Sequence, residues 1–148
     1  MRGPARTPIG LHLTRTAKAV SRAFDDALVV AGGSTPVWLV LISLKTQRLG
    51  NQRELAGAVG IKEATLTHHL NAMEADGLLT RRRDPNNRRI HLVELTEEGE
   101  GAFHRLRRAA MAFDQRLRSG VSDEEVERLE QLLDRLSGNV TGGDDLPG

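Results

Sequence analysis

The segment from Gln52 to Asp76 constrains the fold of this 148-residue chain more than any other part of it. Apolar residues recur there with helical spacing on both sides of a glycine, which predicts one helix over 52–59 and a second over 62–75. Two helices joined by so short a turn need a small residue at their crossing, a glycine at the bend and an apolar anchor in the second helix. These needs are met in order by Ala56, Gly60 and Leu66, so the segment is predicted to be a helix-turn-helix.

The second helix of this motif has one apolar and one polar face. Leu66, Leu70 and Met73 are predicted to turn inward. The outer face then carries short hydrogen-bonding and basic side chains, which suit the base edges and phosphates of a DNA major groove. The predicted contacts on this helix are Lys62, Thr65, Thr67, His68 and Asn71. A solvated amphipathic helix would present a similar face, so the segment alone leaves both interpretations open.

The hydrophobic period changes after Gly77. Two runs with strand-like alternation, 78–82 and 90–95, flank the turn-forming residues Asp84 to Asn87, which predicts a β-hairpin. Arginines crowd this hairpin although the whole chain has a formal net charge of only +1, which indicates that a polyanion meets one edge of the molecule. A hairpin of this kind is typical of a wing that reaches an adjacent groove. Its predicted DNA contacts are Arg82, Arg83, Arg88 and Arg89. The alternative is a solvated loop in which an arginine pairs with Asp84.

Long amphipathic stretches flank this central region. We expect a flexible lead-in over 1–9, a winged helix-turn-helix domain over 34–95 and a disordered, Gly/Asp-rich tail over 138–148. The helices predicted within 10–33 and 96–137 carry apolar stripes that a single small chain has no room to bury. They are therefore predicted to form a homodimer interface, and the fold class is mainly α-helical with one small β-hairpin.

Composition excludes several classes of function. There is no Cys, so disulfides, thiolate metal sites and cysteine nucleophiles are excluded. His68 and His69 are adjacent on a helix and point about 100° apart, so they do not form a metal site by themselves. No nucleophile–base set and no phosphate loop is evident, and we predict neither an enzyme nor a cofactor. No run of about 20 apolar residues or secretory signal is present, and a cytoplasmic location is expected.

Several motifs together resemble one family. They are Gly60-Ile61, Thr65-Leu66-Thr67, Met73-Glu74, Asp76-Gly77-Leu78-Leu79-Thr80-Arg81, Asp84-Pro85-Asn86-Asn87-Arg88-Arg89 and Leu95-Thr96-Glu97-Glu98-Gly99. Across nearly the whole chain this pattern is similar to the multiple-antibiotic-resistance regulator (MarR) family. The resemblance implies a winged helix-turn-helix homodimer that binds double-stranded DNA at a palindromic operator. It further implies a transcriptional regulator, most often a repressor, that a small ligand releases.

The resemblance also points to an effector region and to two departures from the family pattern. Effector pockets of the family lie between the dimer helices and the DNA-binding lobe, where His12, Arg15 and Trp38 are candidate contacts for a small aromatic or anionic molecule. Asn87 stands where the family often has Asp, so the wing is expected to be more mobile. His69 stands where an apolar residue is usual and is expected to be partly buried.

One rival interpretation stays open. A helical protein-interaction module could use the same arginines to dock on an acidic partner. Sequence-selective binding to DNA separates the two interpretations, because a protein-docking module should show none.

Overall fold

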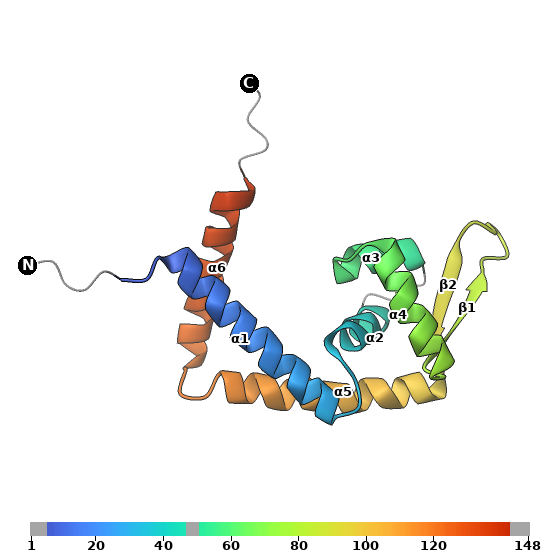
Figure 1. Ribbon diagram of the computed structural model, residues 1–148, viewed down its shortest axis with the longest axis horizontal. Helices are drawn as coiled ribbons and strands as arrows, with labels where there is room; N and C mark the ends of the chain where they lie inside the picture. Colours follow the sequence, from blue (N-terminus) through green and yellow to red (C-terminus); the bar gives the residue numbers. More distant parts are fainter. Residues whose placement is uncertain (1–5, 47–50, 143–148) are drawn as a thin grey trace, which may run out of the picture. The chain divides into compact units, whose positions relative to one another are not determined.

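The computed structural model describes residues 6–46 and 51–142 and contains six helices and one hairpin (Figure 1). The helices and strands are α1 Ile9–Val30, α2 Thr35–Thr46, α3 Gln52–Val59, α4 Glu63–Ala75, β1 Leu79–Arg83, β2 His91–Leu95, α5 Glu97–Leu117 and α6 Asp123–Thr141. Every predicted helix and strand is present, which confirms the mainly α-helical class with one small hairpin. The chain divides into two units, residues 1–113 and 114–148.

The core of the first unit is built around α2. This helix is apolar on nearly all sides, and it contacts α1, α3, α4 and β2. Val40 and Leu41 are fully buried, and the indole of Trp38 stacks on the ring of Phe103 from α5 at 5.8 Å. Complete burial of one such aliphatic side chain contributes roughly 1.5–3 kcal/mol. α2 is therefore the central, buried helix of this unit.

The turn between α3 and α4 follows the predicted chemistry. Asn51 caps α3, its side-chain oxygen accepting from the backbone N–H groups of Arg53 and Glu54. Gly60 adopts a φ of 79°, a left-handed conformation that favours glycine, and its N–H donates to the carbonyl oxygen of Ala56. Ala56 and Leu66 are both buried. Ala56 at the crossing, Gly60 at the bend and Leu66 as the apolar anchor therefore form the predicted helix-turn-helix.

The hairpin is antiparallel and pairs Leu79 with Leu95 and Arg83 with His91 at its two ends. Each strand begins one residue later than predicted. Leu78 is drawn into the end of α4 instead, because its N–H donates to the carbonyl oxygen of Met73. Its own carbonyl oxygen accepts from the N–H of Thr96, the residue before α5.

The start of α5 is pressed against the base of the hairpin at Gly99. The hydroxyl of Thr96 donates to the carbonyl oxygen of Gly77 and accepts from the N–H of Gly99 at 3.1 Å. A methyl group on residue 99 would overlap the carbonyl oxygen of Leu78. Only glycine fits here without backbone movement, whereas Gly101, further along the same helix, has space around it.

The second unit consists of the end of α5 and α6. Ser122 and Glu125 form a capping box, in which each side chain accepts from the other residue's backbone N–H. α6 continues to Thr141, so the expectation of disorder from residue 138 is wrong for 138–141. The hydroxyl of Thr141 donates back to the carbonyl oxygen of Ser137, and the helix tolerates the glycine at 138. Residues 143–148 of the predicted tail lie outside the described residues.

The N-terminal boundary also differs slightly. α1 begins at Ile9, one residue inside the predicted lead-in of 1–9, and residues 1–5 of that lead-in lie outside the described part. No single helix in the described ranges is long and apolar enough to cross a membrane. α1 and α2 pass that test only as a pair, and they are bent by 80°.

Substitution of Gly99 by alanine tests the close packing of α5 on the hairpin. We expect Gly99→Ala to lower the free energy of unfolding by about 1–3 kcal/mol, because the added methyl group displaces backbone. The matched variant Gly101→Ala is expected to stabilise the chain by about 0.5–1 kcal/mol, as alanine does inside a helix. Urea denaturation of both variants measures the difference, and equal stabilities would contradict the packing described here.

Candidate nucleic-acid interface

The inward face of α4 is the one predicted, and its outward face agrees with the prediction at every residue but Thr67. Leu66, Leu70 and Met73 are fully buried in the core of the first unit. Thr65, His68 and Asn71 are exposed, as is Lys62, which precedes the helix. α4 therefore presents a polar surface on the side opposite its anchor.

Thr67 differs from its neighbours on this face. It is half-buried, and its hydroxyl accepts from the Nε2 of Gln52 at 2.7 Å while donating to the carbonyl oxygen of Glu63 at 2.8 Å. The expectation that Thr67 lies outward is corrected accordingly, because its hydroxyl ties α4 to the start of α3. Gln52, which sequence reasoning passed over, supplies the partner.

The two histidines of α4 are separated as their positions on the helix require. His68 is exposed and His69 half-buried, which confirms the expectation for His69. Their ring centroids lie 5.8 Å apart in an edge-to-face arrangement. Within the described ranges, no group of three or more metal-ligating side chains is placed to hold an ion.

The arginines of the hairpin fall into two groups. Arg82 pairs with Glu94 across the strands at 2.9 Å, and Arg83 donates to the carbonyl oxygen of Arg88. Arg88 and Arg89 are exposed, and no carboxylate of a described residue lies within 4.0 Å of them. These two charges therefore remain available to an external anion.

The turn itself is held by side chain–backbone hydrogen bonds. The carboxylate of Asp84 accepts from the N–H of Asn86 at 2.8 Å, so Asp84 serves the turn and not an arginine. The side-chain oxygen of Asn87 accepts from the N–H of Arg89 at 3.1 Å. Asn87 thus shapes the loop that presents Arg89 without needing a charged partner.

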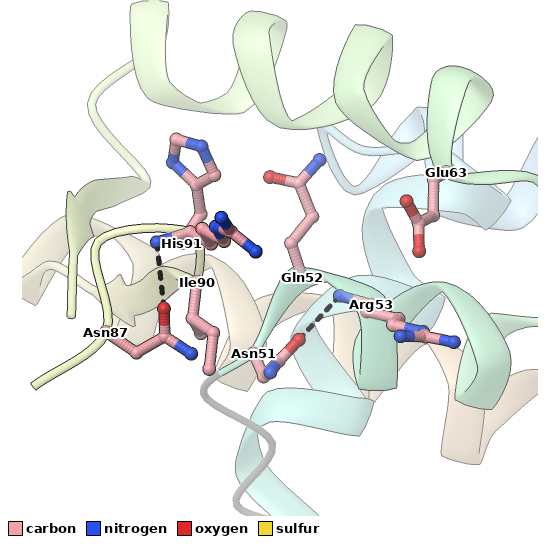
Figure 2. Close-up of a pocket in the computed structure, with 8 residues that line it drawn as sticks. Asn51, Gln52, Arg53, Glu63, Asn87, Ile90 and His91 are labelled. Atoms are coloured by element: carbon pink, nitrogen blue, oxygen red, sulfur yellow. Dashed lines mark hydrogen bonds between the residues drawn. The ribbon is translucent and has the colours of Figure 1, made fainter.

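A hollow of about 420 Å³ lies between the starts of α3 and α4 and the returning strand of the hairpin (Figure 2). The side chains of Gln52 and His91 reach it from α3 and from β2. The remaining lining residues are polar or charged except for one isoleucine: Asn51, Arg53, Glu63, Asn87, Arg89 and Ile90. Gln52 and His91 also line a second hollow, together with Thr67, Glu74 and Arg81. The two hollows therefore adjoin each other at Gln52 and His91.

Glu74 and Arg81 fasten the hairpin to α4. The Glu74 carboxylate accepts from the backbone N–H of Arg81 at 2.9 Å and from its guanidinium at 3.2 Å. The hydrogen bond from this guanidinium lowers the pKa of Glu74 below its usual value. The same guanidinium also donates to the side-chain oxygen of Asn71. Sequence reasoning noted Glu74 and Arg81 only as parts of a motif, because nothing in their spacing shows that they meet.

The model of the MarR family matches residues 34–91 of the chain. A protein of Thauera aromatica, named as a putative transcriptional regulatory protein for the hcr operon, is 30% identical over 129 residues. That alignment spans 86% of this chain and 78% of the relative. The chain belongs to the MarR family of transcriptional regulators.

Solved structures of transcriptional regulators have a similar fold. A MarR family regulator from Rhodococcus sp. RHA1 is 29% identical with a TM-score of 0.73, covering 90% of this chain and 93% of its own. The repressor CouR bound to a 23-mer DNA duplex is 25% identical with a TM-score of 0.79, covering 88% and 92%. CouR from Rhodococcus jostii RHA1 bound to p-coumaroyl-CoA is 28% identical with a TM-score of 0.73, covering 95% of both chains.

The effector candidates of this MarR family member are not gathered into one site. His12 and Arg15 are exposed on the N-terminal half of α1, whereas Trp38 is buried against Phe103. No hydrogen bond or ring contact among the described residues joins Trp38 to His12 or Arg15. Their role as effector contacts stays a prediction.

Proposed function

We propose that this MarR family regulator binds a palindromic operator as a homodimer, with α4 in the major groove and the hairpin as a wing beside it. The observation that carries the proposal is the polar outer face of α4, held next to a hairpin whose tip arginines have no carboxylate partner among the described residues. A duplex presents base-edge donors and acceptors to the helix and phosphates to the wing. CouR, a structural relative with this fold, has been captured on a DNA duplex.

The predicted contacts are divided between base edges and phosphates. Thr65, His68 and Asn71 face outward and are proposed to meet base edges, with Lys62 at the start of the helix on a phosphate. Arg88 and Arg89 are proposed to meet phosphates or the adjacent minor groove. Arg82, Arg83 and Thr67 are also proposed to contact DNA, and each would first have to release its present partner: Glu94, the carbonyl oxygen of Arg88 and Gln52, respectively.

Exposed apolar residues on the terminal helices support the homodimer. Ile9, Leu11 and Leu13 are exposed on α1. No residue of α6 is buried, and its exposed apolar residues are Leu129, Leu132, Leu133 and Val140. Apolar faces of this kind mark association sites in soluble proteins, and most such assemblies are two-fold symmetric. We propose that residues 10–33 and 96–137 form that interface around a DNA-binding domain over 34–95.

We also propose that a small ligand controls operator binding and that the default action is repression. CouR, described as a repressor, binds p-coumaroyl-CoA, which is both aromatic and anionic. A ligand that binds a dimer with misplaced α4 helices more tightly would weaken operator binding by that difference in affinity. Titration of the operator complex with p-coumaroyl-CoA and with CoA alone tests this class of ligand, and no release by either would contradict it.

The relatives are regulators and not enzymes, and we propose no catalytic role for this chain.

Because the operator is part of the chromosome, the proposed location is the cytoplasm. The rival of a protein-docking module has no support among these relatives.

The wing assignment is tested by removing its two unpaired arginines. We expect Arg88→Ala with Arg89→Ala to weaken operator binding and to reduce the slope of log affinity against log salt by about one for each phosphate that is no longer neutralised. Fluorescence anisotropy at several salt concentrations measures both effects. The control replaces Arg107 and Arg108, an exposed arginine pair on α5 outside the wing, by alanine. Because these two residues lie within the range proposed for the dimer, sedimentation must show that the control is still a dimer. A wing variant whose slope equals that of the wild type would refute the assignment.

The dimer is tested on α6. Leu129→Glu with Leu133→Glu places two carboxylates on the apolar stripe, and we expect sedimentation to show a shift from twice the chain mass to a single chain. Operator affinity should fall at least tenfold, because one protomer reaches only one half-site. Gln131→Glu adds a carboxylate on the opposite side of the same helix and should leave the dimer intact. A variant that remains fully dimeric would contradict the proposed interface.

A further inference from the structure

The side-chain amide of Asn71 is held in one orientation. Asn71 is exposed on α4, one helical turn after Thr67 and His68, and its Oδ1 accepts a hydrogen bond from the guanidinium of Arg81. A guanidinium can only donate, so the atom of Asn71 that faces it must be the oxygen. The Nδ2 group, with its two hydrogens, is therefore turned away from Arg81.

Arg81 is itself restrained on several sides. Its side chain is 18% exposed, and its guanidinium and backbone N–H both donate to the carboxylate of Glu74. In the hairpin, Arg81 pairs with Val93, which is buried in the core. A one-residue slip of the strand would turn Val93 out to solvent, so the register that brings Arg81 to Asn71 is well determined.

We propose that Arg81 is a positioning residue that fixes the amide of Asn71, so that Asn71 offers DNA only hydrogen-bond donors. This inference rests on the proposed function, because it specifies how the outer face of α4 discriminates between bases. A free asparagine recognises adenine through both ends of its amide, accepting from N6 and donating to N7. With the oxygen turned toward Arg81, only the donating half is left for the groove.

Guanine is the base that best matches a fixed donor. Its O6 and N7 both accept in the major groove, whereas adenine places a donating amino group where O6 would be. We therefore expect this regulator to prefer guanine over adenine at the base that Asn71 meets. Removal of the Arg81 guanidinium frees the amide to rotate, and adenine should then regain part of its affinity.

The test measures base preference and not only affinity. Operator duplexes selected from a random pool are varied one base at a time, and Asn71→Ala identifies the position at which discrimination disappears. At that position, the ratio of guanine to adenine affinity is compared in the wild type and in Arg81→Met, where we expect it to fall threefold or more. The matched control is Lys45→Met, which also removes one positive charge and breaks one ion pair, to Glu100, on a helix with no proposed DNA contact. That control should leave the ratio unchanged.

A second variant covers the case in which Arg81→Met does not fold. Arg81→Lys keeps the positive charge beside Glu74 but loses the planar fork that serves Glu74 and Asn71 together, and the ratio should again fall. A wild type that prefers adenine, an Asn71→Ala that loses discrimination nowhere, or folded Arg81 variants with the wild-type ratio would each overturn the inference while leaving operator binding intact. A wild type that selects no duplex would overturn the proposed function and this inference with it.

Discussion

The burial of one face of α4 decides what the rest of the molecule can present. Leu66, Leu70 and Met73 are withdrawn into a core centred on α2, and each contributes roughly 1.5–3 kcal/mol by leaving water. Rotation of α4 about its axis would expose these three side chains, so the helix has one stable orientation. Thr65, His68 and Asn71 face solvent because the apolar face of α4, on the other side of the helix, is buried in the core. Their own side-chain chemistry contributes little to their exposure.

The hairpin depends on the same anchor through a short chain of contacts. Glu74 receives the guanidinium and the backbone of Arg81, and Leu78 closes the end of α4. Thr96 and Gly99 then bring α5 against the base of the strands, where a larger residue at 99 would not fit. The tip arginines are therefore carried on a strand pair whose base is fixed to the anchored helix, which is the condition for helix and wing to meet one duplex together.

Local sequence patterns predicted the helices and strands well. They did not predict which side chains of different helices and strands contact one another. Helical spacing gave α3 with its observed bounds, and the need for a left-handed residue identified Gly60. The bond from Gln52 to Thr67 was not foreseen, because it joins residues 15 positions apart whose meeting depends on how α3 crosses α4. The contact of Arg81 with Asn71 was missed for the same reason.

Further differences concern Gly99, the end of α6 and Trp38. Gly99 was noted only as part of a family motif, and its close approach to Leu78 depends on tertiary packing that spacing does not show. The last turn of α6 was overlooked because glycine and polar residues suggest an end, yet the backbone there continues as a helix. Trp38 lies in the core, and its candidate role toward an effector depends on a partner chain or ligand that a single sequence does not define.

Hydroxyl-radical footprinting of the operator complex tests the central claim most directly. Two α4 helices turned outward in a two-fold dimer should protect two symmetry-related stretches of backbone, with centres one helical turn, about 34 Å, apart. Protection of one isolated stretch, or uniform protection without a two-fold pattern, would contradict the claim that paired copies of this anchored helix read the DNA.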